Sequence, residues 1–130
     1  MTSFVLAYDD QPRAAVYVSG DTVWCEGVAE VARRYDVRII VLFMGAARVK
    51  ARGPAALTMT TGDALETARA FPGATIVPVH YQGWAHFTEG RDDISKAFAG
   101  ADLSGRLRLP EPGQSTTLGA FDVGALRSHP

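Results

Sequence analysis

Apolar residues recur along this chain in two patterns, and together these patterns predict an α/β domain. Short runs rich in β-branched and aromatic residues predict strands at 3–8, 14–18, 37–43, 74–79 and, more weakly, 106–109. Apolar residues spaced by three or four positions predict helices at 24–35, 64–71 and 90–99. This order predicts a mixed sheet of about five strands with an N-terminal hairpin, helices on one face, and parallel pairing where a helix joins two strands.

Three connections carry further signals. Asp and Pro at 9–13 predict a hairpin loop of about five residues. The sequence at 60–63 has the form of a capping box that starts the second helix. Residues 44–57 hold two glycines, a proline and three basic side chains, which predicts a long irregular loop that is either functional or a solvated surface excursion.

The chain divides into one expected domain and a tail. Residues 1–113 contain all the periodic segments, so we expect a single α/β domain there. Pro, Gly, Ser and Thr become frequent from Pro110, and we expect 114–130 to form a flexible tail.

The composition of the chain argues against two classes of protein, those that bind nucleic acids and those that span membranes. Of 130 residues, 47% are hydrophobic, and the net charge is −1 with acids and bases interspersed, so we expect no nucleic-acid partner. The longest apolar run, 39–47, is too short to cross a bilayer, and the N-terminus lacks the order of a signal peptide. A single cysteine, Cys25, fits a reducing compartment. We therefore expect a cytoplasmic protein with no membrane contact.

The strongest chemical candidates are a carboxylate and an imidazole at the ends of two strands. Asp21 follows the second strand in a turn that contains Gly20, and His80 follows the strand at 74–79. Because the carboxyl ends of parallel strands share one sheet edge, we expect both side chains to face one cleft. Both are good metal ligands. Their structural alternatives are an Asp that caps backbone amides and a hydrogen-bonded core His.

Three other residues are weaker candidates. His86 lies in an aromatic loop, where it either faces substrate and moves a proton or packs with its aromatic neighbours. Cys25 lies at a helix start, which favours a thiolate, but without a second cysteine we expect a small core residue. His129 is one residue from the end, in the expected tail.

Three motifs in order give the chain a family resemblance. Residues 17–22 (YVSGDT), 57–60 (LTMT) before a helix, and 77–87 (VPVHYQGWAHF) resemble the C-terminal half of metallo-β-lactamase-superfamily hydrolases. The similarity is greatest to the branch of ascorbate-6-phosphate lactonase-like proteins, and it covers roughly residues 1–113.

The resemblance implies a fold and a chemistry. The fold is half of an αββα sandwich in which two sheets pack face to face. By family analogy, Asp21 bridges two metal ions, zinc or another divalent metal, and His80 ligates the second, with His86 as a further catalytic candidate. Ions so held would supply hydroxide for hydrolysis of a lactone, amide or phosphoester.

The sequence departs from the family in its histidines. The family's His-x-His-x-Asp-His motif is absent, since the only histidines are His80, His86 and His129. Two ligands do not make a stable zinc site, so we expect the chain by itself to bind zinc weakly or not at all. The resemblance further implies an uncovered apolar sheet face, for which we expect a homodimer or a separate N-terminal half.

Three hypotheses therefore stay open. The chain is a metal-dependent hydrolase half that is inactive until completed, or a non-catalytic binding or assembly domain that kept the fold and lost the site. The third is a small α/β ligand-binding module that uses Arg48, Lys50 and Arg52. By resemblance the chain is a hydrolase of a lactone, amide or phosphoester bond, but it lacks most of the metal ligands that such an enzyme needs.

Overall fold

The computed structural model describes residues 2–118, which form one mixed sheet with helices on one side. Its strands are β1 (Phe4–Tyr8), β2 (Gln11–Val18), β3 (Val37–Phe43) and β4 (Thr75–Val79). The α-helices are α1 (Glu26–Arg34), α2 (Thr61–Ala70) and α3 (Arg91–Gly100), and two short 3-10 turns are η1 (Lys50–Arg52) and η2 (Ser104–Arg106).

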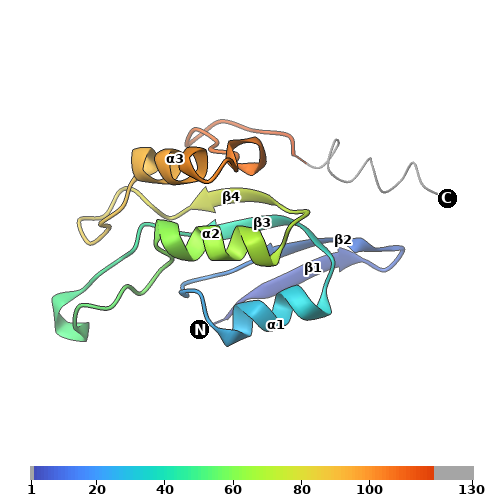
Figure 1. Ribbon diagram of the computed structural model, residues 1–130, viewed down its shortest axis with the longest axis horizontal. Helices are drawn as coiled ribbons and strands as arrows, with labels where there is room; N and C mark the ends of the chain where they lie inside the picture. Colours follow the sequence, from blue (N-terminus) through green and yellow to red (C-terminus); the bar gives the residue numbers. More distant parts are fainter. Residues whose placement is uncertain (1, 119–130) are drawn as a thin grey trace.

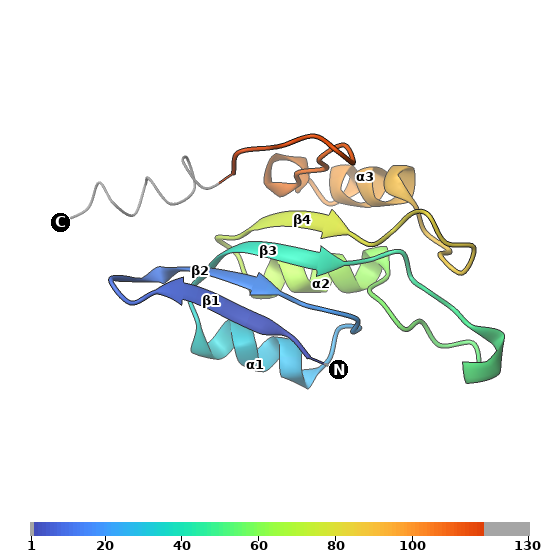
Figure 2. The same cartoon turned by 180° about the vertical axis from the view of Figure 1, so that it is seen from behind.

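The sheet has the order β1-β2-β3-β4. β1 pairs antiparallel with β2, whereas β2 with β3 and β3 with β4 are parallel pairs. The helices α1 and α2 make the two parallel crossovers, as the strand–helix–strand order predicted. The carboxyl ends of β2, β3 and β4 therefore lie at one edge of the sheet (Figure 2).

The helices cover a single face. Figure 1 shows α1 and α2 in front of the strands and α3 beside β4, and Figure 2 shows the strands from the other side with the helices behind them. Alternate strand residues point into the helix layer, among them Tyr17, Ile40 and Ile76, each at most 1% exposed. They pack on buried residues of the helices such as Val28, Ala68 and Phe98.

The opposite sheet face carries apolar side chains without a covering layer. The strand register aligns Leu6 with Val16 and Val16 with Ile39 in one row. A second row runs through Phe4, Val18, Val41 and Val77. On β1 the side chains of Phe4, Leu6 and Tyr8 are 56%, 57% and 73% exposed, whereas Ile39 and Val77, farther along the two rows, are only 8% and 6% exposed. We call this surface the open face.

The sequence predicted the fold class correctly, with differences in detail. The expected fifth strand at 106–109 is reduced to one parallel bridge, Leu107 to Ile76, so the described sheet has four strands. The expected five-residue hairpin loop is also wrong: Tyr8 pairs with Gln11, which leaves two connecting residues. β2 accommodates Pro12 because its pairing with β3 begins only at Ala15.

The remaining expectations concern helix ends, the tail and the membrane. Thr60 and Asp63 form the predicted capping box of α2. Of the expected flexible tail, 114–130, residues 119–130 lie outside the described part of the chain, as does His129. Within residues 2–118, no helix is both long and apolar enough for a bilayer span.

Candidate functional site

Asp21 is placed by a tight connection between the ends of β2 and β3. The Ser19 N–H donates to the Val41 carbonyl at 3.0 Å, and the Ser19 hydroxyl accepts from the Phe43 N–H at 3.0 Å. Gly20 then turns the chain with φ +64°, and a Cβ there would lie 2.5 Å from the Thr2 carbonyl oxygen. Only glycine fits this turn without a shift. Asp21 therefore stands at the sheet edge with its side chain 64% exposed.

His80 follows β4 at the same edge in an unusual backbone conformation. Its φ is +60°, the left-handed region that few non-glycine residues occupy. The ring lies against Phe43 and Phe87, with centroid separations of 5.2 and 5.0 Å. Such strained residues are found preferentially at functional sites, where the surrounding structure holds them in place.

The two candidate ligands meet across the end of β3. The His80 Nδ1 atom lies 3.7 Å from an Asp21 carboxylate oxygen, and the His80 side chain is 33% exposed. This separation agrees with the prediction that both side chains face one cleft at the carboxyl edge. A nitrogen and an oxygen this close could bind one cation between them.

Gly45 allows the aromatic loop to pack at this edge. It follows Met44 after β3 with φ +95°, and a Cβ on it would lie 2.8 Å from a Phe87 ring carbon. Its carbonyl accepts from the N–H groups of Thr88 at 2.8 Å and Glu89 at 3.1 Å. The loop at 81–87 is thus fixed against the start of the loop at 44–57.

His86 lies in this aromatic loop. Its ring is 4.7 Å from Phe87, the residue that also contacts His80, and 6.0 Å from Trp84, which is 67% exposed. His86 therefore packs with its aromatic neighbours. Its catalytic role remains a prediction.

Cys25 differs from its expected place in the core. It is exposed and occupies the N-cap position of α1. The Val28 N–H at the helix start favours the thiolate and lowers the pKa of the Cys25 thiol, with partial burial acting in the opposite direction. The core prediction failed because it weighed residue type above the position at the helix end.

The basic loop at 44–57 is held in part by its own arginine. The Arg48 guanidinium donates to the Pro54 carbonyl at 2.7 Å and to the Thr88 hydroxyl at 3.4 Å. Lys50 and Arg52 belong to η1 and are exposed. Of the three basic residues in this loop, only Arg48 thus holds the loop in place through hydrogen bonds of its side chain.

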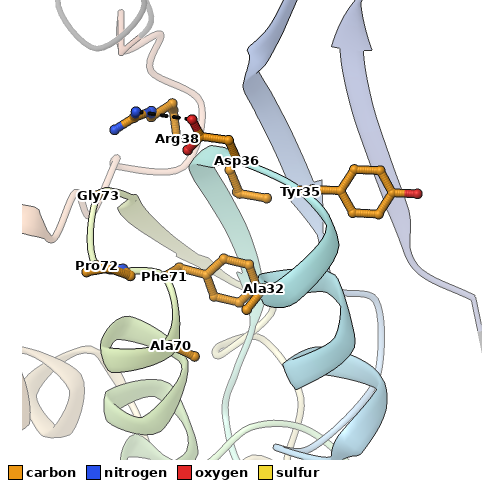
Figure 3. Close-up of a pocket in the computed structure, with 9 residues that line it drawn as sticks. Ala32, Tyr35, Asp36, Arg38, Ala70, Phe71, Pro72 and Gly73 are labelled. Carbon is orange, nitrogen blue, oxygen red and sulfur yellow. Dashed lines mark hydrogen bonds and ion pairs between the residues drawn. The ribbon is translucent and has the colours of Figure 1, made fainter.

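Two hollows are relevant to the search for a site. One of about 300 Å³ lies at the opposite edge of the sheet, between the ends of α1 and α2 (Figure 3). Its charged residues, Arg38 and Asp36, pair with each other at 3.3 Å, and the Tyr35 side chain points away.

The second, which we call the β4 hollow, has about 250 Å³ and is lined by residues 78–82 and 110–112. His80 lines it and also faces Asp21. Sequence reasoning missed Gln82 and Glu111 in this wall, although Pro110 and Pro112 after the last apolar run were a signal for a rigid segment.

The residues present do not by themselves fit a metal ion. Within residues 2–118 there is no group of three or more His, Cys, Asp or Glu side chains arranged to hold one. Asp21 and His80 supply two donors, whereas catalytic zinc has three protein ligands. The edge of the sheet is thus half of a metal site at most.

Comparison with known proteins gives this geometry a context. No protein-family profile matches the chain. The chain is 29% identical over 112 residues to the UPF0173 protein YddR of Bacillus subtilis (strain 168). The aligned region covers 86% of this chain and 43% of that protein.

Solved structures show the same half-length match. A possible metal-dependent hydrolase from Veillonella parvula DSM 2008 superposes with a TM-score of 0.80 at 28% identity, over 89% of this chain and 43% of that one. The isothiocyanate hydrolase from Delia radicum gut bacteria gives a TM-score of 0.79 at 23% identity, with the same coverage. A metallo hydrolase from Ignicoccus hospitalis KIN4/I gives 0.62 at 22% identity, over 81% and 41%.

The predicted resemblance is therefore confirmed. The chain resembles the C-terminal half of metallo-β-lactamase-superfamily hydrolases, and it spans less than half the length of the relatives it matches. Its α/β fold, with a mixed sheet and helices, is that of metal-dependent hydrolases over this half.

Proposed function

We propose that this chain supplies one half of a metal-dependent hydrolase and is inactive until a second half covers its open face. The observation that carries the proposal is the Asp21–His80 pair, 3.7 Å apart at the edge of a sheet whose apolar face has no cover. Two metal donors and one uncovered face are both what half of a two-sheet hydrolase would present.

In this proposal Asp21 and His80 are metal ligands, and the remaining ligands come from the second half. Among residues 2–118, only two donors lie at this edge, one fewer than catalytic zinc requires. His86 is a further catalytic candidate by family analogy and is not one of the proposed metal ligands. The bond hydrolysed is a lactone, amide or phosphoester, by family analogy.

The second half is either another copy of this chain or a separate polypeptide. The matched region is 43% of the Veillonella parvula structure and of the isothiocyanate hydrolase, so more than half of each of those chains corresponds to nothing in this one. A stable interface of this kind buries on the order of 2,000 Å² in total. The single cysteine fits assembly in the cytoplasm.

A non-catalytic binding or assembly domain is the second candidate. The observation in its favour is the shortage of metal donors within residues 2–118. The two proposals differ in one property: an assembly domain covers its open face and still takes up no metal, whereas a hydrolase half takes up metal once it is covered.

Elemental analysis of zinc, fraction by fraction after gel filtration, tests the proposal. We expect the monomeric chain to hold only substoichiometric zinc and to show no esterase or lactonase turnover. Any zinc in assembled fractions should disappear in Asp21→Ala and in His80→Ala and persist in the matched control His86→Ala.

Stoichiometric zinc in a monomer, lost in both ligand variants and accompanied by turnover, would contradict the claim of an incomplete half. Assembled fractions without zinc would favour the assembly domain.

A further inference from the structure

The β4 hollow is the cavity that adjoins the candidate pair directly. His80 forms part of its wall, and the same imidazole lies 3.7 Å from Asp21. A molecule in the hollow would therefore lie against the residue that faces Asp21.

The wall of this hollow is rigid. Three of its residues, Pro78, Pro110 and Pro112, are prolines with a fixed φ. The C-terminal part is tied down by Arg91, whose guanidinium donates to the Leu109 carbonyl at 2.9 Å and pairs with Glu111 at 3.0 Å. A preformed wall lowers the entropy that is lost when a ligand binds.

The polar groups of the wall disfavour an anion. Prolines have no N–H, so they offer a negative group no main-chain donor. Glu111 is one of the lining residues, whereas Arg91, which pairs with its carboxylate at 3.0 Å, is not, so a ligand in the hollow meets the negative member of this pair. Gln82 supplies an amide that both donates and accepts, which suits an uncharged carbonyl or amide.

We propose that the β4 hollow binds the compact, uncharged apolar substituent of the substrate and rejects an anionic one. This inference rests on the proposed function and defines its substrate class. At about 250 Å³ the hollow lies just below the usual range for drug-sized ligands, so it fits a group of the size of one aromatic ring. Gln82 is its hydrogen-bonding residue, and Glu111 is the residue that discriminates by charge.

Saturation-transfer NMR with two ring compounds of equal size, benzamide and benzoate, tests this on the purified full chain. We expect benzamide to bind and the affinity for benzoate to be lower by a factor of about ten or more, because a like charge beside Glu111 is unfavourable. Glu111→Gln should bring the two affinities close together, whereas the matched control Glu66→Gln, on exposed α2 surface, should leave their ratio unchanged.

A blocking variant locates the binding. Gln82 is exposed, so Gln82→Trp should fill the hollow without disturbing the fold and should abolish benzamide binding. Absence of benzamide binding, equal affinity for both compounds, or benzamide binding that survives Gln82→Trp would each overturn the inference. The test uses neither metal nor a second half, so its failure would leave the zinc experiment above unaffected.

Discussion

The two faces of the sheet present opposite environments to the same four strands. On one face, Ile40 and Leu42 of β3 are fully buried beneath α1, α2 and α3. On the other, the side chains of β1 stand open, with Leu6 57% and Tyr8 73% exposed. Apolar residues are thus present on both faces, but only one face has a cover within residues 2–118.

β3 shows what this difference means. Its sequence, VRIIVLF, is almost continuously apolar rather than alternating, the pattern of a strand that is buried on both sides. Alternate residues of β3 point to opposite faces of the sheet. The side chains of Ile40 and Leu42 pack against the helices, whereas those of Ile39 and Val41 belong to the open face. The strand therefore carries an apolar surface that the helix layer does not use, which is the physical basis for expecting a second layer.

The largest expected difference between the faces is in stability. Ile40→Ala removes a fully buried side chain beneath the helices and should lower the free energy of unfolding by about 2–5 kcal/mol. Leu6→Ala on the open face should change it by less than about 0.5 kcal/mol in the monomer. Urea denaturation of both variants measures the contrast, and equal losses would show that the open face is already covered.

A smaller effect is expected at the start of α2, within the covered layer. Thr60→Ala removes the hydroxyl that accepts from the Asp63 N–H at 3.0 Å and should destabilise the chain by about 1 kcal/mol. Glu66→Ala, on the exposed side of the same helix, is the control and should be close to neutral. If both variants unfold at the same urea concentration, the capping box does not stabilise this layer.

The elements and the candidate pair were predictable because their signals are local. The apolar runs identify β3 and β4, and the spacing of apolar residues identifies α1 and α2. The position of Asp21 and His80 at one edge follows from the parallel order of their strands, which the crossover helices dictate. The roles of these two residues as metal ligands remain predictions.

The features that sequence reasoning missed depend on non-local contacts. The segment at 106–109 has a strand-like pattern, but its Arg106 guanidinium donates to the carbonyls of Phe71 and Ala74. Its pairing with β4 is limited to the bridge of Leu107 to Ile76, in which the Arg108 N–H donates to the Ile76 carbonyl at 2.9 Å. The β4 hollow exists because Arg91 ties residues 109–111 beside His80 across eighteen positions of sequence. Periodicity contains no information on such pairings.

Sedimentation of the purified chain at micromolar concentration tests the central claim most directly, namely that the open face requires a cover. We predict self-association or association with a second half. Leu6→Lys, which places a charge on the open face, should weaken it at least about tenfold, because an unpaired charge is costly in an apolar interface. Ala99→Lys, on exposed α3 surface, should have no effect. A wild-type chain that sediments as a monomer, with no partner present and no difference among the three proteins, would contradict the claim that a second copy of the chain covers the open face.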